Sequence, residues 1–151
     1  MTATAGRYVK AVLWDMDGTL MNSQPIWDES FRRRCQERGG TVTPEQVAGI
    51  AGASIARTRE IIAETGATES PEDPATAEVF ARIAADVGEA VRADPPILPG
   101  ARRITSMLSE IGLAQVIVTQ SPRPIVESVA HALGDVFVEL VTGDDGLPGK
   151  P

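Results

Sequence analysis

A short apolar segment that ends in two closely spaced acids is the strongest constraint on the fold of this chain. Residues 8–14 read YVKAVLW, Asp15 and Asp17 follow directly, and Gly18 and Thr19 come next. An apolar run rich in strand formers is typical of a buried strand, as in a parallel sheet. Gly18 permits a tight turn after it. The segment therefore predicts a buried strand with two acids at its carboxyl end.

The spacing of apolar residues and of helix-ending signals predicts the other elements. A stiff, proline-rich connector at residues 94–100 separates an all-helical stretch from a part in which helices and strands alternate. The expected helices are residues 25–38, 55–64, 75–93, 101–110 and 122–133, together with one that follows the capping box TPEQ at 43–46. Two further buried strands are expected: AQVIVT, which ends at Thr119, and VFVELV at 136–141.

This order of elements predicts a doubly wound α/β fold with a parallel sheet and right-handed crossovers. Residues 1–20 and 97–151 are expected to form the core, and residues 21–96 an inserted helical domain with its hinges. Ligands of such sheets bind beyond the carboxyl ends of the strands. The segments expected at that edge are residues 15–19, 119–121 and 142–150.

Carboxylates, hydroxyls and one lysine lie in these three segments. Asp15 and Asp17 are suited to Mg²⁺, which prefers oxygen ligands, and one acid can attack while the other moves a proton. Thr119 and Ser121 precede a helix, and hydroxyls at a helix N-terminus suit a phosphate. Lys150 could neutralise a phosphate and a nucleophile together.

Each candidate also has an ordinary structural interpretation. The acids and Gly18 could simply form a strand-ending turn, Ser121 could cap the helix that begins near Pro122, and Lys150 could be a solvated loop residue. The arginines at residues 32–34 are expected to form a solvated helix face. Residue types alone leave these alternatives open.

Composition narrows the class of partner. The net charge of -7 argues against binding to nucleic acid or to an anionic membrane, which require a basic face. A single cysteine, Cys35, excludes an intrachain disulfide, and the first ten residues lack the apolar core of a signal peptide. No stretch approaches the roughly 20 apolar residues of a membrane span. We therefore expect a cytoplasmic protein with a small-molecule substrate.

Taken together, these segments resemble the haloacid dehalogenase-like hydrolase superfamily, and within it the sugar-phosphate phosphatase and β-phosphoglucomutase-like branch. DMDGTL at residues 15–20 is similar to the first family motif, VIVTQS with Thr119 to the second, and PGKP with Lys150 to the third. LMNSQPIW resembles the segment that leads into the family's helical cap, and PILPGA resembles the return from it.

The resemblance implies Mg²⁺-dependent phosphoryl transfer through an aspartyl-phosphate. Asp15 would be the nucleophile and Asp17 the general acid/base, with Mg²⁺ bound by the Asp15 side chain and the Asp17 backbone carbonyl. The cap would close over the site and exclude water. The candidate phosphate-binding residues are Thr119, Ser121, Lys150 and Gly18.

The end of the sequence departs from the family pattern. Family members continue past the third motif to a further strand and a fourth, acidic motif that completes the Mg²⁺ site, whereas this sequence stops at Pro151. Only three strands of the sheet are thus expected, with residues 8–14 as an exposed apolar edge and one sheet face uncovered. Asp144 and Asp145 could replace the missing acids or could lie in a solvated turn.

Three functions remain open at this stage. The first is a Mg²⁺-dependent phosphatase acting on a small phosphorylated metabolite, for instance a sugar phosphate. The second is a truncated, non-catalytic remnant, or a half that a partner completes, with self-association through the exposed sheet edge as one form of pairing. The third is a phosphoglucomutase-type enzyme that returns the phosphoryl group to its substrate.

Overall fold

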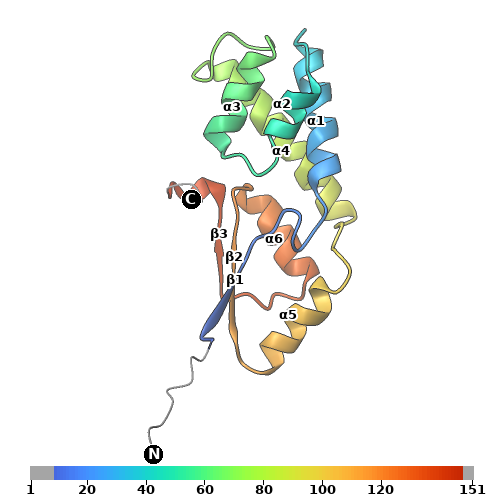
Figure 1. Ribbon diagram of the computed structural model, residues 1–151, viewed down its shortest axis with the longest axis vertical. Helices are drawn as coiled ribbons and strands as arrows, with labels where there is room; N and C mark the ends of the chain where they lie inside the picture. The colour runs from blue at the N-terminus through green and yellow to red at the C-terminus, as the bar shows by residue number, and fades with distance from the viewer. Residues whose placement is uncertain (1–8, 148–151) are drawn as a thin grey trace, which may run out of the picture.

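A three-stranded parallel sheet forms one side of the lower lobe in Figure 1. The computed structural model describes residues 9–147 of the chain. The strands are β1 (Ala11–Trp14), β2 (Ala114–Val118) and β3 (Glu139–Val141), and their order in the sheet is β1-β2-β3. In the register, Leu13 lies beside Val116, and Val116 lies beside Glu139. The parallel sheet with its helices confirms the predicted α/β fold.

The six helices within residues 9–147 begin and end within one residue of the bounds that the sequence predicts, apart from the second, for which only the capping box was specified. That box is confirmed, because the Thr43 hydroxyl accepts from the Gln46 amide at 3.2 Å and the Gln46 side chain accepts from the Thr43 amide at 2.9 Å. The helices are α1 (Gln24–Glu37), α2 (Pro44–Gly49), α3 (Ile55–Glu64), α4 (Pro74–Ala93), α5 (Ala101–Glu110) and α6 (Arg123–Ala132), and a 3₁₀ turn, η1 (Gly143–Asp145), follows β3.

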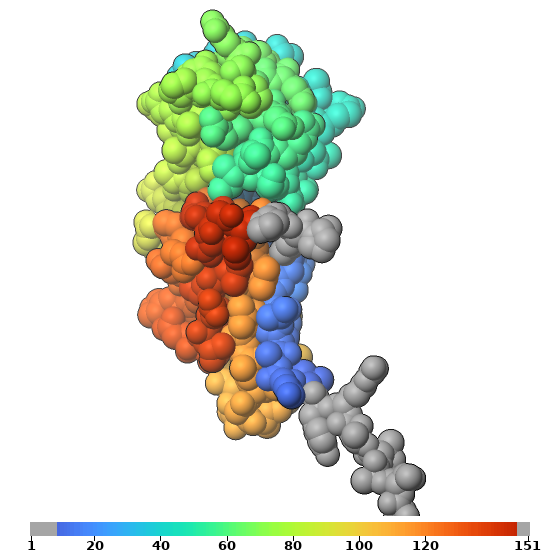
Figure 2. Space-filling model, turned by 90° about the vertical axis from the view of Figure 1, so that its left-hand side faces the viewer, coloured from blue at the N-terminus to red at the C-terminus, as the bar shows by residue number. Residues whose placement is uncertain are grey.

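Among the described residues, no helix covers one face of the sheet, which we call the bare face. Both α5 and α6 lie on the same side of it in Figure 1, and on that side Trp14 and Ile117 pack with Ile125 and Val129. Figure 2 looks onto the opposite face, where the three strands run side by side at the surface. Leu13 on this face is 69% exposed. The expected uncovered face and exposed β1 edge are confirmed.

The prediction of a strand within residues 8–14 is confirmed at Ala11–Trp14, but the prediction that it is buried is wrong, and Tyr8 lies outside the described residues. In β1 exposed and half-buried side chains alternate, because a helix covers only one of its faces. The third strand is shorter than predicted. Its ladder is regular only over Glu139–Val141, although the Val138 amide already donates to the Gln115 carbonyl at 2.8 Å.

The side of helix α5 that packs against the sheet is not the side on which most of its apolar residues lie. Its buried residues are Ala101 and Thr105, and the Thr105 carbonyl accepts a hydrogen bond from the Gln115 side chain in β2 at 2.8 Å. The apolar residues that share one side of this helix by their spacing are largely exposed, with Met107 at 52% and Ile111 at 75%. Periodicity shows which residues share a side of a helix, but not which side the neighbouring element covers.

The upper lobe consists of α1 to α4 around its own apolar cluster (Figure 1). Cys35, the single cysteine, is fully buried there. Helix α4 belongs to both lobes, because its first half contributes Val79 and Ile83 to the upper cluster and its second half contributes Val87 and Val91 to the lower one. The remaining buried members of the upper cluster are Phe31, Val47, Ile50, Ile61, Ile62 and Ala67.

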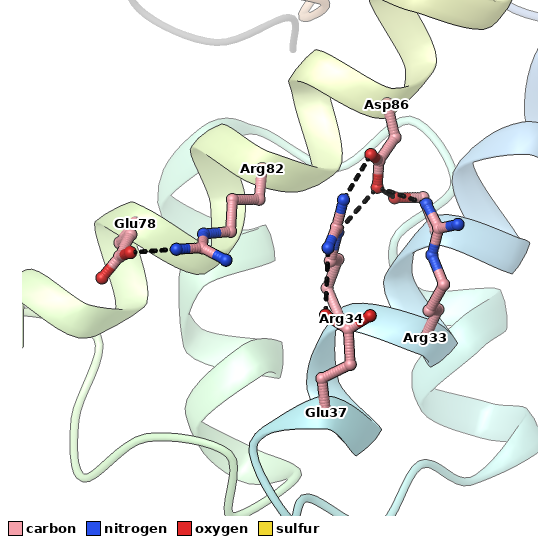
Figure 3. Close-up of polar contacts among 7 residues, drawn as sticks. Arg33, Arg34, Glu37, Glu78, Arg82 and Asp86 are labelled. Atoms are coloured by element: carbon pink, nitrogen blue, oxygen red, sulfur yellow. Dashed lines mark hydrogen bonds and ion pairs between the residues drawn. The ribbon is translucent and has the colours of Figure 1, made fainter.

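A charged cluster ties α1 to α4 within the upper lobe (Figure 3). Arg34 donates to both carboxylate oxygens of Asp86, at 2.6 and 2.8 Å, and Arg33 lies 2.8 Å from the same carboxylate. The Ser30 hydroxyl also donates to it. These contacts hold the pKa of Asp86 well below its ordinary value, chiefly through the Arg34 hydrogen bonds. The expectation of a solvated arginine face is therefore wrong for Arg34, whose side chain is 23% exposed, whereas Arg33 remains at the surface with 50% exposed.

The two connections between the lobes run side by side. The Asn22 amide donates to the Pro96 carbonyl at 2.8 Å, and the Leu98 amide donates to the Leu20 carbonyl at 2.9 Å. The proposed division into a core and an inserted domain at these points stays a prediction. Among the described helices, none is long and apolar enough to cross a membrane. The expected cytoplasmic location and the absence of nucleic-acid and membrane partners also stay predictions.

Candidate active site

The turn after β1 presents its acids at the edge of the sheet that faces the upper lobe. Met16 is fully buried beneath the turn, while Asp15 is exposed. The Thr19 hydroxyl donates to the Asp15 carboxylate at 2.9 Å. Gly18 has a φ of +80°, as the predicted tight turn requires, and its amide donates to the Met21 carbonyl at 2.8 Å. Gly18 thus shapes the turn, and its predicted contact with phosphate stays a prediction.

Three hydroxyls from separate segments converge on the Asp17 carboxylate. Thr119 donates to Oδ2 at 3.0 Å and Ser121 donates to the same oxygen at 2.7 Å. Ser23, which is fully buried at the start of α1, donates to Oδ1. The structure therefore brings Asp17, Thr119 and Ser121 together across about a hundred residues of sequence, as their places at strand ends predict.

The expected capping role of Ser121 is wrong, because its hydroxyl is directed to Asp17. Helix α6 begins at Arg123 with Pro122 at the N-cap and no side-chain cap. The Ser121 amide donates to the Thr119 hydroxyl at 3.1 Å. In this arrangement the Thr119 hydroxyl directs its single proton to Asp17, so its contact with a phosphoryl oxygen stays a prediction.

Ser23 is a site residue that the sequence did not reveal. A serine two residues before Pro25 is typical of an N-cap, and Ser23 does occupy that position in α1. Its side chain makes no capping hydrogen bond, because it binds Asp17 instead. The only available signal was its place immediately before the first helix.

Asp144 and Asp145 lie in the exposed 3₁₀ turn after β3, as the solvated-turn interpretation predicts, and both also contact Arg123 at the start of α6. Asp144 accepts the Arg123 amide at 2.6 Å, so it satisfies an amide at the start of α6. Asp145 accepts from the Arg123 guanidinium at 2.7 Å and from the Thr142 amide at 2.7 Å. The Arg123 hydrogen bonds are the main cause that lowers the pKa of Asp145. Both acids therefore join the end of β3 to the start of α6.

The 3₁₀ turn after β3 lies unusually close to the end of β2. A Cβ placed on Gly143 would lie 2.2 Å from the Gln120 carbonyl oxygen, and the Gly143 amide donates to the Ser121 carbonyl at 3.2 Å. It would also lie 3.2 Å from Ile55 Cδ1 in the upper lobe. Only a residue without a side chain fits this position, which brings the segment after β3 against the site.

A cleft of about 220 Å³ opens between the strand ends and the upper lobe. Its lower wall contains Asp15, Asp17, Thr119 and Ser121. Its upper wall comes from α1, from the segment between α2 and α3, and from α3 and α4. Lys150, the predicted charge-balancing residue, lies outside the described residues.

The acids of this cleft fit a magnesium site only in part. Among residues 9–147, no group of three or more His, Cys, Asp or Glu side chains is placed to hold a metal ion. In phosphoryl-transfer sites Mg²⁺ is commonly bound through one or two carboxylates together with substrate phosphates and water. Asp15 and Asp17 meet that smaller requirement, so they could bind Mg²⁺ together with a phosphorylated ligand.

Comparison with known proteins agrees with this geometry. The family model described as haloacid dehalogenase-like hydrolase matches residues 9–151. The chain belongs to this family. The resemblance inferred from the DMDGTL, VIVTQS and PGKP segments is confirmed.

Relatives of this haloacid dehalogenase-like chain include phosphatases. Hexitol phosphatase B of Escherichia coli K12 is 27% identical over 149 residues, which cover 96% of this chain and 65% of that protein. Phosphoglycolate phosphatase of Rhodobacter capsulatus is 26% identical over 142 residues, which cover 93% of this chain and 64% of that protein. The chain thus spans slightly less than two thirds of the length of these relatives.

A solved structure shows the same fold. The crystal structure of β-phosphoglucomutase from Clostridium difficile superposes with a TM-score of 0.78 at 15% identity. The match covers 95% of this chain and 66% of that one. This chain therefore shares its α/β core and helical lobe with that protein.

Proposed function

We propose that the chain is a Mg²⁺-dependent phosphatase that hydrolyses a small phosphorylated metabolite of the sugar-phosphate class. The observation that supports it most is the cleft in which Asp15 and Asp17 lie beside the Thr119 and Ser121 hydroxyls. Relatives named hexitol phosphatase and phosphoglycolate phosphatase support the same class of reaction.

In this reaction a carboxylate oxygen of Asp15 attacks phosphorus, and the bond from phosphorus to the leaving oxygen breaks. Asp17 gives a proton to that leaving oxygen. Asp17 then takes a proton from the water that attacks the aspartyl-phosphate, which releases inorganic phosphate and restores Asp15. The exposure of Asp15 and its place at the base of the cleft suit it to the attack.

The remaining residues bind and orient the substrate. The Asp15 side chain and the Asp17 backbone carbonyl would hold Mg²⁺, which when bound neutralises charge on the phosphoryl group. Thr119, Ser121 and Lys150 would hold phosphoryl oxygens. The hydroxyls that now contact Asp17 keep its carboxylate directed along the floor of the cleft.

A second candidate is a half that another polypeptide completes. Two observations favour it. One face of the sheet is uncovered, and Asp15 and Asp17 are the only acids among the described residues that line the cleft. The mutase alternative differs only in where the phosphoryl group goes after the first step. The choice of substrate therefore has to distinguish the mutase from the phosphatase.

Turnover of the purified 151-residue chain tests the proposal. We expect Mg²⁺-dependent release of phosphate from p-nitrophenyl phosphate and from a panel of sugar phosphates, and we expect Asp15→Asn to abolish it. Asp135→Asn, an exposed acid at the far end of α6, is the matched control and should keep wild-type turnover. Turnover that persists in Asp15→Asn would exclude the nucleophile assignment. No turnover in a folded wild-type chain would favour the partner-completed half.

A further inference from the structure

The two walls of the cleft differ in chemistry. The lower wall bears the acids and hydroxyls of the proposed phosphoryl-transfer site. The upper wall is apolar for the most part, with Trp27 from α1, Ile50 and Ile55 near α2 and α3, and Phe80 from α4. A substrate whose phosphate lies on the lower wall must therefore place its leaving group against carbon and aromatic surface.

Two polar side chains of the upper wall are neutral and already have partners within the chain. The Gln24 amide donates to Asp28 at 2.6 Å, and the Thr58 hydroxyl donates to the Ser54 carbonyl at 3.0 Å. Each retains an oxygen that can accept a hydrogen bond from a hydroxyl group. The wall is thus suited to apolar C–H surface with a few hydroxyls.

Arginines on α1, α3 and α4 form ion pairs with acids of the same lobe, and none of the described residues that line the cleft is an arginine. Among the described residues that line the cleft, the charged ones are Asp15 and Asp17. A second anionic group on a substrate would lie between apolar side chains and two carboxylates, and burial of an uncompensated charge is costly. These arginine–acid pairs include Arg34–Asp86, Arg57–Glu60 and Arg82–Glu78.

We infer that the cleft selects phosphate monoesters whose leaving group carries no second anionic group, such as a sugar or polyol monophosphate. Bisphosphates and phosphate esters that bear a carboxylate are disfavoured. This inference rests on the proposed phosphatase function and narrows its substrate class. It also separates the phosphatase from the mutase alternative, since a phosphoryl group returned to a phosphorylated sugar passes through a bisphosphate in the same cleft.

Ile55 is the residue of this wall that we assign to specificity. It is the first residue of α3, it lines the cleft, and its Cδ1 lies against Gly143 near the Gln120 backbone of the lower wall. A cation at this position would face the leaving group from across the cleft. Ile55→Arg should therefore reduce the discrimination against a second anionic group, whereas Ile55→Leu keeps the wall apolar and serves as the matched control.

Matched substrate pairs test the inference with the full chain and Mg²⁺. Fructose 6-phosphate and fructose 1,6-bisphosphate differ by a second phosphate, and glycerol 3-phosphate and 3-phosphoglycerate differ by a carboxylate. We expect kcat/KM to favour the first member of each pair by at least about tenfold, since an uncompensated charge costs more than a neutral unsatisfied group. Ile55→Arg should reduce these ratios by about tenfold, and Ile55→Leu should leave them unchanged.

The outcomes separate this inference from the proposed function. Turnover with equal or higher kcat/KM for the bisphosphate and for 3-phosphoglycerate overturns the inference and leaves the phosphatase intact. If the chain shows no turnover, the wild-type chain is titrated calorimetrically with the same four esters. The ratio of the Kd values within each pair then takes the place of the ratio of kcat/KM values. Binding that favours the neutral leaving groups then supports the inference alone, and binding of none of the four overturns it.

Discussion

A single carboxylate, that of Asp17, joins three segments that are far apart in the sequence. Its hydroxyl donors come from the turn before α1, from the end of β2 and from the approach to α6. The hydroxyl of Ser23 is the donor that links this site to the upper lobe, because Ser23 is the residue from which α1 begins. A change at Ser23 should therefore affect both stability and the site.

Ser23→Ala is expected to lower the free energy of unfolding by about 2 kcal/mol, because a buried hydroxyl that donates to a carboxylate is lost. Urea denaturation followed by circular dichroism measures this change. Ser128→Ala is the control, since its exposed hydroxyl donates only to the Pro124 carbonyl within α6. An unchanged denaturation midpoint in Ser23→Ala would contradict the importance of the Asp17 contact.

Asp86 makes the stability of the chain depend on pH. Its pKa in the folded chain is held below the ordinary value of 3.8. The Arg34 and Arg33 contacts therefore stabilise the fold fully at pH values above that ordinary pKa, and their contribution is lost as the pH falls through the lower folded-state pKa. The side chain of Asp86 is only 16% exposed, so screening by solvent is limited.

Asp86→Asn is expected to cost about 2 kcal/mol near neutral pH, because hydrogen bonds to a charged group become neutral ones. The difference in unfolding free energy between wild type and variant should shrink as the pH falls from about 5 to about 2. Denaturation curves at a series of pH values test this, with the exposed Glu89→Gln on the same helix as control. A difference that does not change with pH would contradict the assignment.

At the scale of the elements, the close approach of the turn after β3 to the end of β2 depends on Gly143. Gly143→Ala should lower the free energy of unfolding by about 2 kcal/mol, because its Cβ would overlap the Gln120 carbonyl and backbone cannot yield easily. Chemical denaturation measures the loss. Gly88→Ala in α4 is the matched control, since its added methyl meets only Ile125 Cγ1 at an ordinary 3.7 Å and improves helix propensity.

Helix positions could be predicted because their signals are local. Thr43 and Gln46 form a capping box within four residues, and glycines and prolines mark the ends of the other helices. The exposed side of α5 could not be predicted, since Met107 and Ile111 give the same periodicity whether or not another element covers them. Burial depends on the partner surface, which the local sequence does not contain.

The site was predictable in part for a different reason. Asp15, Asp17, Thr119 and Ser121 lie at strand ends, and the parallel sheet brings strand ends together regardless of their separation in the sequence. The hydroxyl contacts to Asp17 were not predictable, because they depend on side-chain rotamers. The pairing of Asp145 with Arg123 depends on the close approach at Gly143, which a loop sequence does not specify.

At the scale of the whole molecule, the bare sheet face is an exposed apolar surface. Leu13 and Val9 are each 69% exposed next to the free edge of β1. Exposed edges with apolar side chains favour pairing with another chain. The suggestion of self-association through this edge stays a prediction, and it has a direct test.

Leu13→Glu is expected to shift the chain toward the monomer at high protein concentration, because a charge on the bare face opposes pairing of two copies. Sedimentation velocity over a range of concentrations measures the shift. Ile111→Glu places the same charge just after α5, on the exposed apolar side of that helix, and is the control. If both variants and the wild type sediment alike, the sheet face does not mediate association.

Helix α4 passes through both apolar clusters without a break over Pro74–Ala93. Ile83 in the upper cluster and Val87 in the lower one lie only about one helical turn apart, so a single stretch of backbone serves both. Loss of packing in one lobe therefore frays a helix that the other lobe also requires. The two lobes should melt as one cooperative unit, with a single calorimetric transition whose van't Hoff and calorimetric enthalpies agree.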